Sequence, residues 1–121
     1  MNKHYIRFLF LILFLSQWSI RTLETDQLKK EFYGKPRIID GDSIEIKNEK
    51  IRLLGIDAFE KKQECSKKDG AKYKCGEIAI SNLSIIISGQ TIRCKVEKKD
   101  RYKRWLATCY IGKLDINENM V

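Results

Sequence analysis

Residues 43–57 read SIEIKNEKIRLLGID and carry the pattern that decides the fold. From Ser43 to Lys47 apolar and polar residues alternate, which is typical of a half-buried β-strand. Asn48-Glu49 supplies a turn, and the run from Ile51 to Ile56 predicts a return strand. Because Leu53 and Leu54 are adjacent, we expect this strand to be covered on both faces. The stretch therefore predicts a β-hairpin built into a sheet.

The following residues predict one helix and a second hairpin. Apolar residues recur at i, i+4, i+7 and i+8 in Ala79, Leu83, Ile86 and Ile87, which predicts an amphipathic helix. Gly89 stands where a C-terminal helix cap belongs. The runs 91–97 and 105–111 both alternate and flank a charged loop, so we expect an antiparallel pair. Short strands around one helix predict a mainly β fold with α, a five-stranded OB-type barrel with at least one packed helix.

Composition divides the 121 residues into three parts. A basic start followed by the apolar run 8–15 predicts that residues 1–20 are a secretory signal peptide or an uncleaved N-terminal anchor. Residues 21–35 are polar and without period, which indicates a linker, and residues 36–121 are expected to form the folded domain. We therefore expect a secreted or periplasmic protein, attached to a membrane if the apolar segment is retained.

Four cysteines, Cys65, Cys75, Cys94 and Cys109, lie outside the leader. An even number in a small exported domain indicates disulfides, and four cysteines allow three pairings. Cys94 and Cys109 stand at matching distances from the loop of the second hairpin, which favours a bridge between them and leaves Cys65 with Cys75. A zinc site is disfavoured, because the chain has no Cys-x-x-Cys pair and its one histidine lies in the leader.

The formal net charge is +8, from 24 Lys and Arg against 16 Asp and Glu. An excess of this size favours polyanionic partners and speeds their encounter with the protein. Charge alone is weak evidence for any one partner.

Charged side chains gather at predicted strand ends in three stretches, 39–43, 51–60 and 100–104. Asp42 follows a glycine at a strand entry and Asp57 ends a strand, and two carboxylates with carbonyl and water oxygens suit a hard cation such as Ca²⁺. Arg52 lies inside an apolar strand, where a charge is costly unless it is paired. Guanidinium groups match phosphate oxygens in bidentate geometry. Each residue also has an ordinary interpretation, such as a turn, a strand cap or an exposed edge position.

Taken together, these stretches resemble the thermonuclease (staphylococcal-nuclease-like) family. The similarity runs over residues 38–121 and rests on Asp-Gly-Asp-Ser, Arg-Leu-Leu-Gly-Ile-Asp-x-x-Glu and Asp-Arg-Tyr-x-Arg-x-Leu-Ala, in that order. The chain also resembles the exported bacterial branch of this family, which has a Cys-Gly pair before the helix, matched here by Cys75-Gly76. The resemblance implies an OB barrel with helices beside it, and Ca²⁺-dependent hydrolysis of DNA and RNA with low sequence specificity.

The resemblance also implies the ligands of the metal and the path of the nucleic acid. Asp42, Asp57 and the backbone carbonyl of Ala58 are expected to hold Ca²⁺. Arg101 and Tyr102 are expected to lie along the nucleic-acid path, where they offer charge and a stacking surface.

Three further residues receive catalytic roles from the resemblance. Arg52 is expected to hold the scissile phosphate, Glu60 to orient or deprotonate the attacking water, and Arg104 to clamp the phosphate and assist the leaving oxygen. The chain departs from the family pattern at several positions, of which two bear on the placement of these side chains. Phe59 replaces a proline, which is expected to loosen the placement of Glu60, and Lys103 replaces a glycine, which disfavours a positive φ there.

Two alternatives remain open on the sequence. An OB barrel can bind single-stranded nucleic acid without chemistry, so the chain can instead be a catalytically inactive binding module. The family also continues with helices beyond the position of Val121, so the second alternative is a truncated product without a function of its own.

Overall fold

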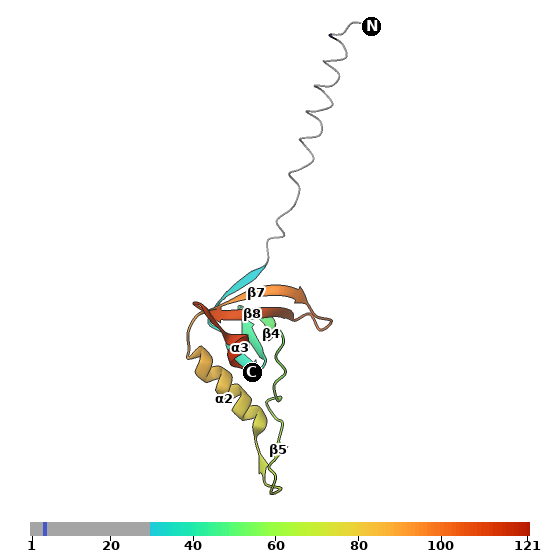
Figure 1. Ribbon diagram of the computed structural model, residues 1–121, viewed down its shortest axis with the longest axis vertical. Helices are drawn as coiled ribbons and strands as arrows, with labels where there is room; N and C mark the ends of the chain where they lie inside the picture. Colours follow the sequence, from blue (N-terminus) through green and yellow to red (C-terminus); the bar gives the residue numbers. More distant parts are fainter. Residues whose placement is uncertain (1–3, 5–29) are drawn as a thin grey trace.

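The computed structural model describes His4 and residues 30–121. Their elements, in chain order, are β1 (Glu31–Gly34), β2 (Arg37–Asp40), β3 (Ser43–Ile46), β4 (Glu49–Leu53), β5 (Cys65–Ser66), β6 (Lys72–Tyr73), α2 (Cys75–Ile87), β7 (Ile92–Lys99), β8 (Trp105–Ile111), β9 (Leu114–Asp115) and α3 (Ile116–Asn119). Figure 1 shows the strands curled together, with α2 beside them and the β5–β6 hairpin extending away.

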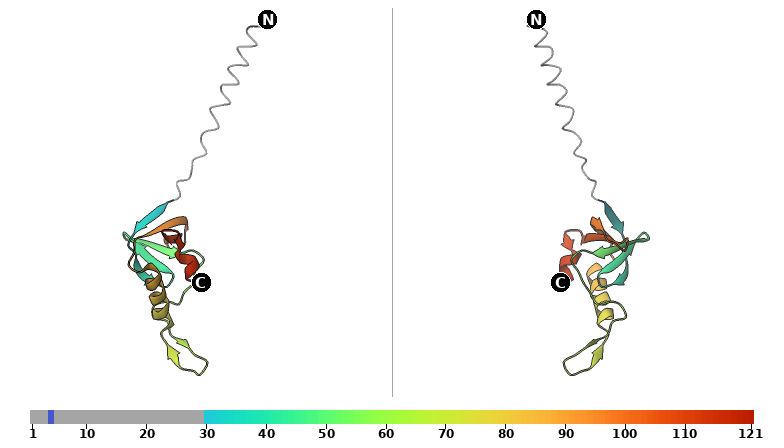
Figure 2. Two further views of the ribbon diagram at one scale, coloured as in Figure 1. Left: turned by 60° about the vertical axis from the view of Figure 1, so that its left-hand side comes forward. Right: turned by 90° about the vertical axis from the view of Figure 1, so that its right-hand side faces the viewer.

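The main sheet follows the order β1-β7-β8-β4-β3-β2, with β9 paired to β8. The β4–β8 pairing is parallel and the others are antiparallel. The two strands at the ends of this order are consecutive in the chain, because only Lys35 and Pro36 separate β1 from β2. Proline has no N–H to donate to a ladder, so one strand changes partners at this point. The sheet therefore curls into an OB-type barrel, seen from two sides in Figure 2. Its bent first strand pairs with β7 through β1 and with β3 through β2.

The fold class predicted from the sequence is confirmed. When β1 and β2 are counted as one bent strand, five principal strands form the barrel, and the two-residue β9 is an addition. The core consists mainly of isoleucine and leucine side chains from the barrel strands and α2. Helix α2 packs against β2 and presents Ala79, Leu83 and Ile87 as buried residues, with Ile86 half-buried against the core. The predicted helical stripe is therefore confirmed.

Two boundaries differ from the prediction by a few residues. The β3–β4 turn lies at Lys47 and Asn48, both with positive φ, and β4 ends at Leu53 because Leu54 and Gly55 turn the chain away. Helix α2 is capped by Ser88 in the left-handed conformation, one residue before the expected Gly89. The Ser88 N–H donates to the Ser84 carbonyl, which satisfies one of the last carbonyls of the helix.

The prediction that residues 21–35 form a linker is wrong for β1. Residues 31–34 pair antiparallel with β7, from Glu31 opposite Lys95 to Gly34 opposite Ile92. The folded part therefore begins before Pro36, because β7 offers an edge whose backbone groups β1 satisfies. The predicted leader, apart from His4, and residues 21–29 lie outside the described residues. Within the described part of the chain, no helix is long and apolar enough to cross a membrane.

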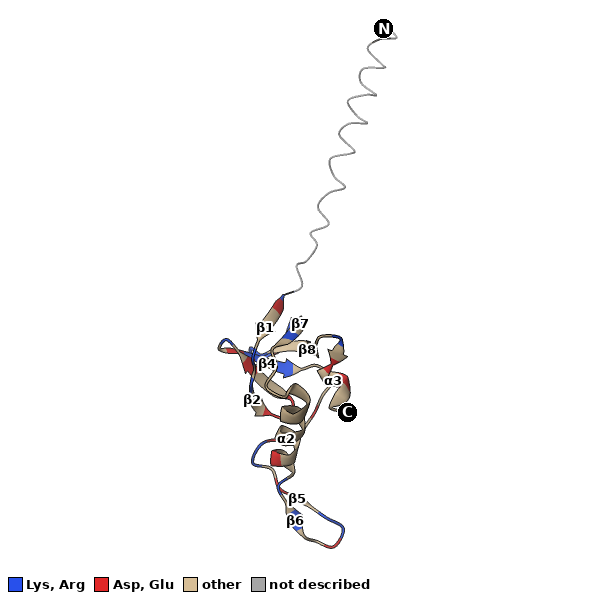
Figure 3. Cartoon of the chain, turned by 90° about the vertical axis from the view of Figure 1, so that its left-hand side faces the viewer, with Lys and Arg blue, Asp and Glu red and all other residues tan. Residues whose placement is uncertain are grey.

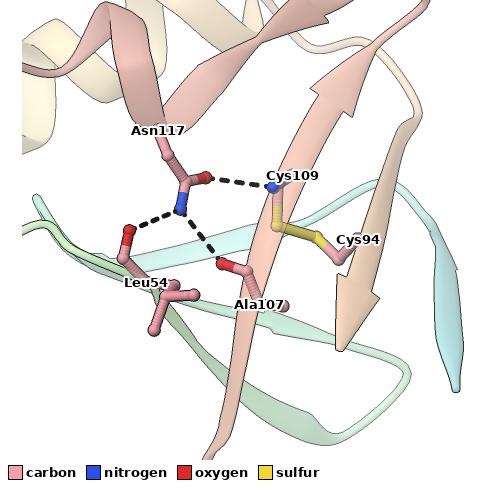
Figure 4. Close-up of a disulfide and its surroundings, with 5 residues drawn as sticks. All are labelled: Leu54, Cys94, Ala107, Cys109 and Asn117. Atoms are coloured by element: carbon pink, nitrogen blue, oxygen red, sulfur yellow. Dashed lines mark hydrogen bonds between the residues drawn. A yellow bond between two sulfur atoms is a disulfide. The ribbon is translucent and has the colours of Figure 1, made fainter. Parts of the chain in front are cut away.

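Both predicted disulfides are present, Cys65–Cys75 and Cys94–Cys109. Cys94 and Cys109 are direct partners across β7 and β8, and both are completely buried. Figure 4 shows this bridge beside the side-chain amide of Asn117 from α3. Cys65 and Cys75 instead close the base of the β5–β6 hairpin at the start of α2.

Candidate active site

A polar cleft of about 390 Å³ opens where β3 and β4 meet the loop that follows β4. It is lined by Asp40, Asp42, Ser43, Arg52, Asp57, Ala58, Phe59, Glu60, Gln63 and Arg104. The six residues predicted as catalytic or metal-binding are all in this set. Residues from three separate stretches of sequence therefore meet in one place.

Arg52 connects the two predicted metal-binding carboxylates. Its Nη1 donates to Oδ2 of Asp42 at 2.8 Å, and its Nη2 donates to Oδ1 of Asp57 at 3.2 Å. Nη2 also donates to the carbonyl of Ile56 at 3.2 Å. The Arg52 side chain is 25% exposed, so these partners compensate the burial of its charge. The alternative interpretation of Arg52 as an exposed edge position is excluded, because β4 lies between β3 and β8 in the sheet.

The carboxylate of Asp42 is buried and held by three donors. Its Oδ1 accepts from the Ser43 hydroxyl at 2.8 Å, and its Oδ2 accepts from the backbone N–H of Ala58 at 3.1 Å as well as from Arg52. Gly41, just before it, packs so closely that a Cβ atom there would lie 2.7 Å from that of Ala79 on α2. Close packing of helix and loop on this glycine thus sets the position of Asp42. In contrast, the Asp57 side chain is 95% exposed.

Glu60 lies in a turn that is attached to the start of α2. Its backbone N–H donates to the side chain of Gln63 at 3.2 Å, and its carbonyl accepts from the Gln63 N–H at 2.8 Å. The next N–H, of Lys61, donates to Oδ1 of Asp40 at 2.8 Å. Gly76 of α2 abuts the Glu60 carbonyl so closely that no side chain fits between them. Although Phe59 stands where the family has a proline, these contacts hold the backbone at Glu60 in place.

Arg104 is oriented by Asp100, to which the sequence analysis gave no role. The Asp100 carboxylate accepts from the backbone N–H of Arg104 and from its Nε, both at 2.9 Å, and from the N–H of Tyr102 at 2.9 Å. Burial opposes ionisation of Asp100, but these hydrogen bonds and the Arg104 charge outweigh it and hold the pKa of this carboxyl below its ordinary value. Lys103 takes a φ of 63°, so the turn adopts the left-handed conformation that glycine would adopt with less strain.

Arg101 and Tyr102 lie on the same β7–β8 loop but do not line the cleft. The Tyr102 ring is near two guanidinium groups. Its centroid lies 4.8 Å from Cζ of Arg101 and 5.5 Å from Cζ of Arg104. Tyr102 is 64% exposed, so one face of the loop presents an aromatic ring to solvent next to Arg104. Their place on a nucleic-acid path stays a prediction.

Asp40, Gln63 and Asp100 are the positioning residues that the sequence analysis missed. Asp40 and Asp100 stand inside the charged stretches, and a carboxylate within four residues of a functional group is a signal that could have found them. Gln63 lies in a polar run with no pattern, so nothing in the sequence distinguishes it from its neighbours.

The oxygen atoms that line the cleft are of the type that a hard cation prefers as ligands. Asp42, Asp57 and the carbonyl of Ala58 offer oxygens, which Ca²⁺ prefers, and no sulfur or imidazole ligand competes in the cleft. Among the described residues, no group of three or more His, Cys, Asp and Glu side chains is placed to hold a metal ion together. Since Ca²⁺ takes six to eight oxygens, most of its ligands would have to be water and phosphate oxygens.

Comparison with known proteins agrees with the geometry. The chain is 40% identical over 78 residues to a succinoglycan biosynthesis protein, ExoI, of Rhizobium meliloti (strain 1021), covering 64% of this chain and 41% of that protein. It is 30% identical over 117 residues to an uncharacterized endonuclease of Escherichia coli O157:H7, covering 92% of this chain and 65% of the relative. An uncharacterized endonuclease of Haemophilus influenzae (strain ATCC 51907 / DSM 11121 / KW20 / Rd) is 37% identical over 90 residues, covering 70% and 45%.

This chain thus spans between 41% and 65% of the length of these relatives. The family model described as "Staphylococcal nuclease homologue" matches residues 50–121, which include Arg52, Asp57, Glu60 and Arg104. With the barrel and its cleft, this match shows that the chain belongs to the staphylococcal nuclease family.

Proposed function

We propose that this protein is an exported, Ca²⁺-dependent nuclease that hydrolyses phosphodiester bonds of DNA and RNA with low sequence specificity. One observation carries the proposal: Arg52 joins Asp42 and Asp57 in a polar cleft that also contains Glu60 and Arg104. A structural ion pair needs only one carboxylate for one arginine. Two aspartates, two arginines and a glutamate in one open cleft are the groups that bind a phosphodiester and activate water.

Each side chain has a role that follows from its chemistry. Arg52 and Arg104 donate N–H groups to the phosphate, where charge increases as the pentacovalent state forms. Glu60 accepts a proton from the attacking water as the water oxygen bonds to phosphorus. The bond from phosphorus to the leaving oxygen then breaks; Arg104 stabilises the charge on that oxygen, which takes up a proton from solvent water. Asp42, Asp57 and the carbonyl of Ala58 would hold Ca²⁺, which supplies charge neutralisation at the phosphate when bound.

Asp100 supports the role of Arg104 without contacting the substrate. It engages Nε of Arg104, and among the described residues the two Nη groups make no hydrogen bond. The guanidinium is therefore oriented by one edge, while its other edge is free to donate to phosphate oxygens.

Low sequence specificity follows from the kind of contact that the cleft offers. Its lining is dominated by charged side chains suited to phosphate and metal. Contacts to phosphate position a nucleic acid but do not report its base sequence. Export is supported by the pairing of all four cysteines in two disulfides, since such bridges persist in oxidising compartments.

The test compares Arg52→Lys with Arg37→Lys in cleavage of plasmid DNA and single-stranded RNA in the presence of Ca²⁺. Arg52→Lys keeps the positive charge but loses the fork that joins two carboxylates, so we expect kcat to fall by about 10²-fold or more. Arg37 is the matched control, because it pairs with Glu45 outside the cleft. Equal turnover in the two folded variants would contradict the assignment.

The binding-module alternative predicts a different result from the same samples. Exposed Tyr102 between two arginines offers the stacking platform and charge that single-strand binders use. A folded wild-type protein that binds single strands but cleaves neither substrate with Ca²⁺ would favour that alternative.

A further inference from the structure

Residues 61–74 form a basic surface next to the cleft, here called the lysine hairpin. It contains Lys61, Lys62, Lys67, Lys68, Lys72 and Lys74. The acidic residues of the segment are Glu64 and Asp69, so its formal net charge is strongly positive. Strands β5 and β6 carry this hairpin away from the barrel, beyond the end of α2 (Figures 1 and 3).

The lysine hairpin contributes no side chain to the core. All of its residues are exposed except Cys65 and Tyr73, which are half-buried. Within the part of the chain that the structure describes, only Lys74 forms an ion pair, with Glu77 on α2 at 3.4 Å. The other five ammonium groups have no carboxylate partner there. Core packing and internal ion pairing therefore do not explain this concentration of lysines.

The hairpin is nevertheless held in a defined shape. Cys65 opposes Tyr73 in a short antiparallel ladder, and the Cys65–Cys75 bridge closes its base. At the tip, the N–H of Lys67 donates to the Ala71 carbonyl at 2.8 Å, and Gly70 takes a φ of 85°. Since a bridge and a turn restrict the chain, the lysines are presented by a constrained arm and lose less entropy on binding than those of a free loop.

The base of the hairpin is continuous with the cleft. Lys61 directly follows Glu60, and its backbone N–H donates to Asp40, which lines the cleft. At the other end, Gly76 packs on the Glu60 carbonyl and its N–H donates to the Gln63 carbonyl at 3.2 Å. A polyanion that leaves the cleft on the side of Glu60 therefore meets the lysine hairpin.

We propose that the lysine hairpin is a second phosphate-binding surface that extends the nucleic-acid interface beyond the cleft, so that the protein binds long strands more tightly than short ones. The proposal rests on the proposed function, because it takes the polyanion in the cleft to be a nucleic acid. Nucleic acid is favoured over a membrane because the tip, 67–70, reads KKDG and has no apolar side chain to enter a lipid interface.

Binding in excess chelator tests the hairpin without cleavage. We would titrate the full chain into a labelled 24-nucleotide single strand at several salt concentrations and follow fluorescence anisotropy. The test variant carries Lys67→Gln, Lys68→Gln and Lys72→Gln. The control carries Lys35→Gln, Lys47→Gln and Lys113→Gln, exposed lysines in connections between strands that do not line the cleft. Both variants lose three charges.

If all three hairpin lysines contact phosphate, the slope of log Kd against log salt falls by about 2, at roughly 0.7 per contact on a single strand. The control is expected to lose much less, and a dinucleotide that fills only the cleft should bind all forms equally. Equal slopes and equal Kd values for the two triple variants would overturn the proposal. A parallel titration uses phosphatidylserine vesicles. A hairpin variant that binds these vesicles more weakly than the control but binds the 24-mer as tightly as the control would also overturn the proposal.

The proposed function and the hairpin fail in different ways. If wild type cleaves nothing with Ca²⁺ but the hairpin variant binds the 24-mer more weakly than the control, the hairpin stands and the catalytic proposal falls. If wild type cleaves and the two triple variants bind the 24-mer alike, the catalytic proposal stands and the hairpin falls.

Discussion

The buried amide of Asn117 gives a prediction about what holds the barrel together. Strand β4 pairs with β8 only as far as Leu53 opposite Ala107, and β9 pairs with β8 only from Tyr110 onward, so Thr108 and Cys109 lie between these two pairings. Asn117, from α3, takes the place of a neighbouring strand there (Figure 4). Its Oδ1 accepts from the Cys109 N–H at 3.0 Å, and its Nδ2 donates to the carbonyls of Leu54 at 2.9 Å and Ala107 at 3.0 Å.

Asn117→Ala removes all three hydrogen bonds at a residue that is 5% exposed. The Cys109 N–H is then a buried donor without a partner, which costs about 1–3 kcal/mol. The Leu54 carbonyl loses a partner worth about 1 kcal/mol. The Ala107 carbonyl keeps the N–H of Leu54 at 2.8 Å, so its loss is small. We therefore expect the free energy of unfolding to fall by about 2–4 kcal/mol, a large share of the total for a small domain.

The assay is urea unfolding of the oxidised chain at pH 7, followed by circular dichroism. Asn119→Ala is the control, because Asn119 lies two residues away in α3 and donates to the Asp115 carbonyl at 2.7 Å from an exposed position. We expect that control to cost within about 0.5 kcal/mol. If Asn117→Ala costs no more than Asn119→Ala, the reasoning is refuted.

Asn117→Asp tests the acceptor and donor functions of the amide separately, because the side chain keeps almost the same shape but loses its N–H groups. A carboxylate still accepts from the Cys109 N–H but faces the carbonyls of Leu54 and Ala107 without a proton to donate. We expect destabilisation at pH 7 that lessens on acidification, when a protonated carboxyl regains one donor. A destabilisation that does not change with pH would show that the two carbonyls do not matter.

Three further perturbations follow from the same contacts. Because the pKa of Asp100 is lowered in the folded state, its stabilisation is complete above the ordinary carboxyl pKa of about 4 and is lost as pH falls through the lower folded value. The difference in unfolding free energy between wild type and Asp100→Asn should therefore be constant near neutrality and shrink in acid; a constant difference down to pH 2 would contradict this. Replacing Cys94 and Cys109 by serine should lower the unfolding free energy more than the same change at the base of the lysine hairpin, because only the first pair is fully buried; equal urea midpoints would contradict the comparison. Gly41→Ala should cost about 1–3 kcal/mol and reduce cleavage, because a Cβ there collides with α2 and shifts Asp42; unchanged stability and activity would count against this packing.

The parts of the fold that could be predicted are those where a local pattern meets a buried face. Alternation in the 43–46 run predicts β3, because one face of that strand contributes Ile44 and Ile46 to the core. Strand β1 reads EFYG and is only partly buried, so hydrophobic periodicity could not reveal it. It exists because its backbone satisfies the edge of β7, and that pairing has no signal in the sequence of β1 itself.

The same distinction separates the predicted site from its supports. Asp42, Arg52 and Asp57 were identifiable because a charge next to an apolar run is unusual. Asn117 was not, since it stands in a polar run, and its burial depends on the parallel pairing of two strands far apart in the sequence. The residues proposed to act on a substrate were therefore easier to recognise than those that hold them in place.

The most direct measurement of the central claim is cleavage of plasmid DNA and single-stranded RNA by the purified, oxidised chain, in Ca²⁺ and in parallel with excess chelator. The proposed function predicts breakdown of both substrates in Ca²⁺, none in chelator, and recovery when Ca²⁺ is restored. A sample with a cooperative unfolding transition that leaves both substrates intact in Ca²⁺ would contradict it.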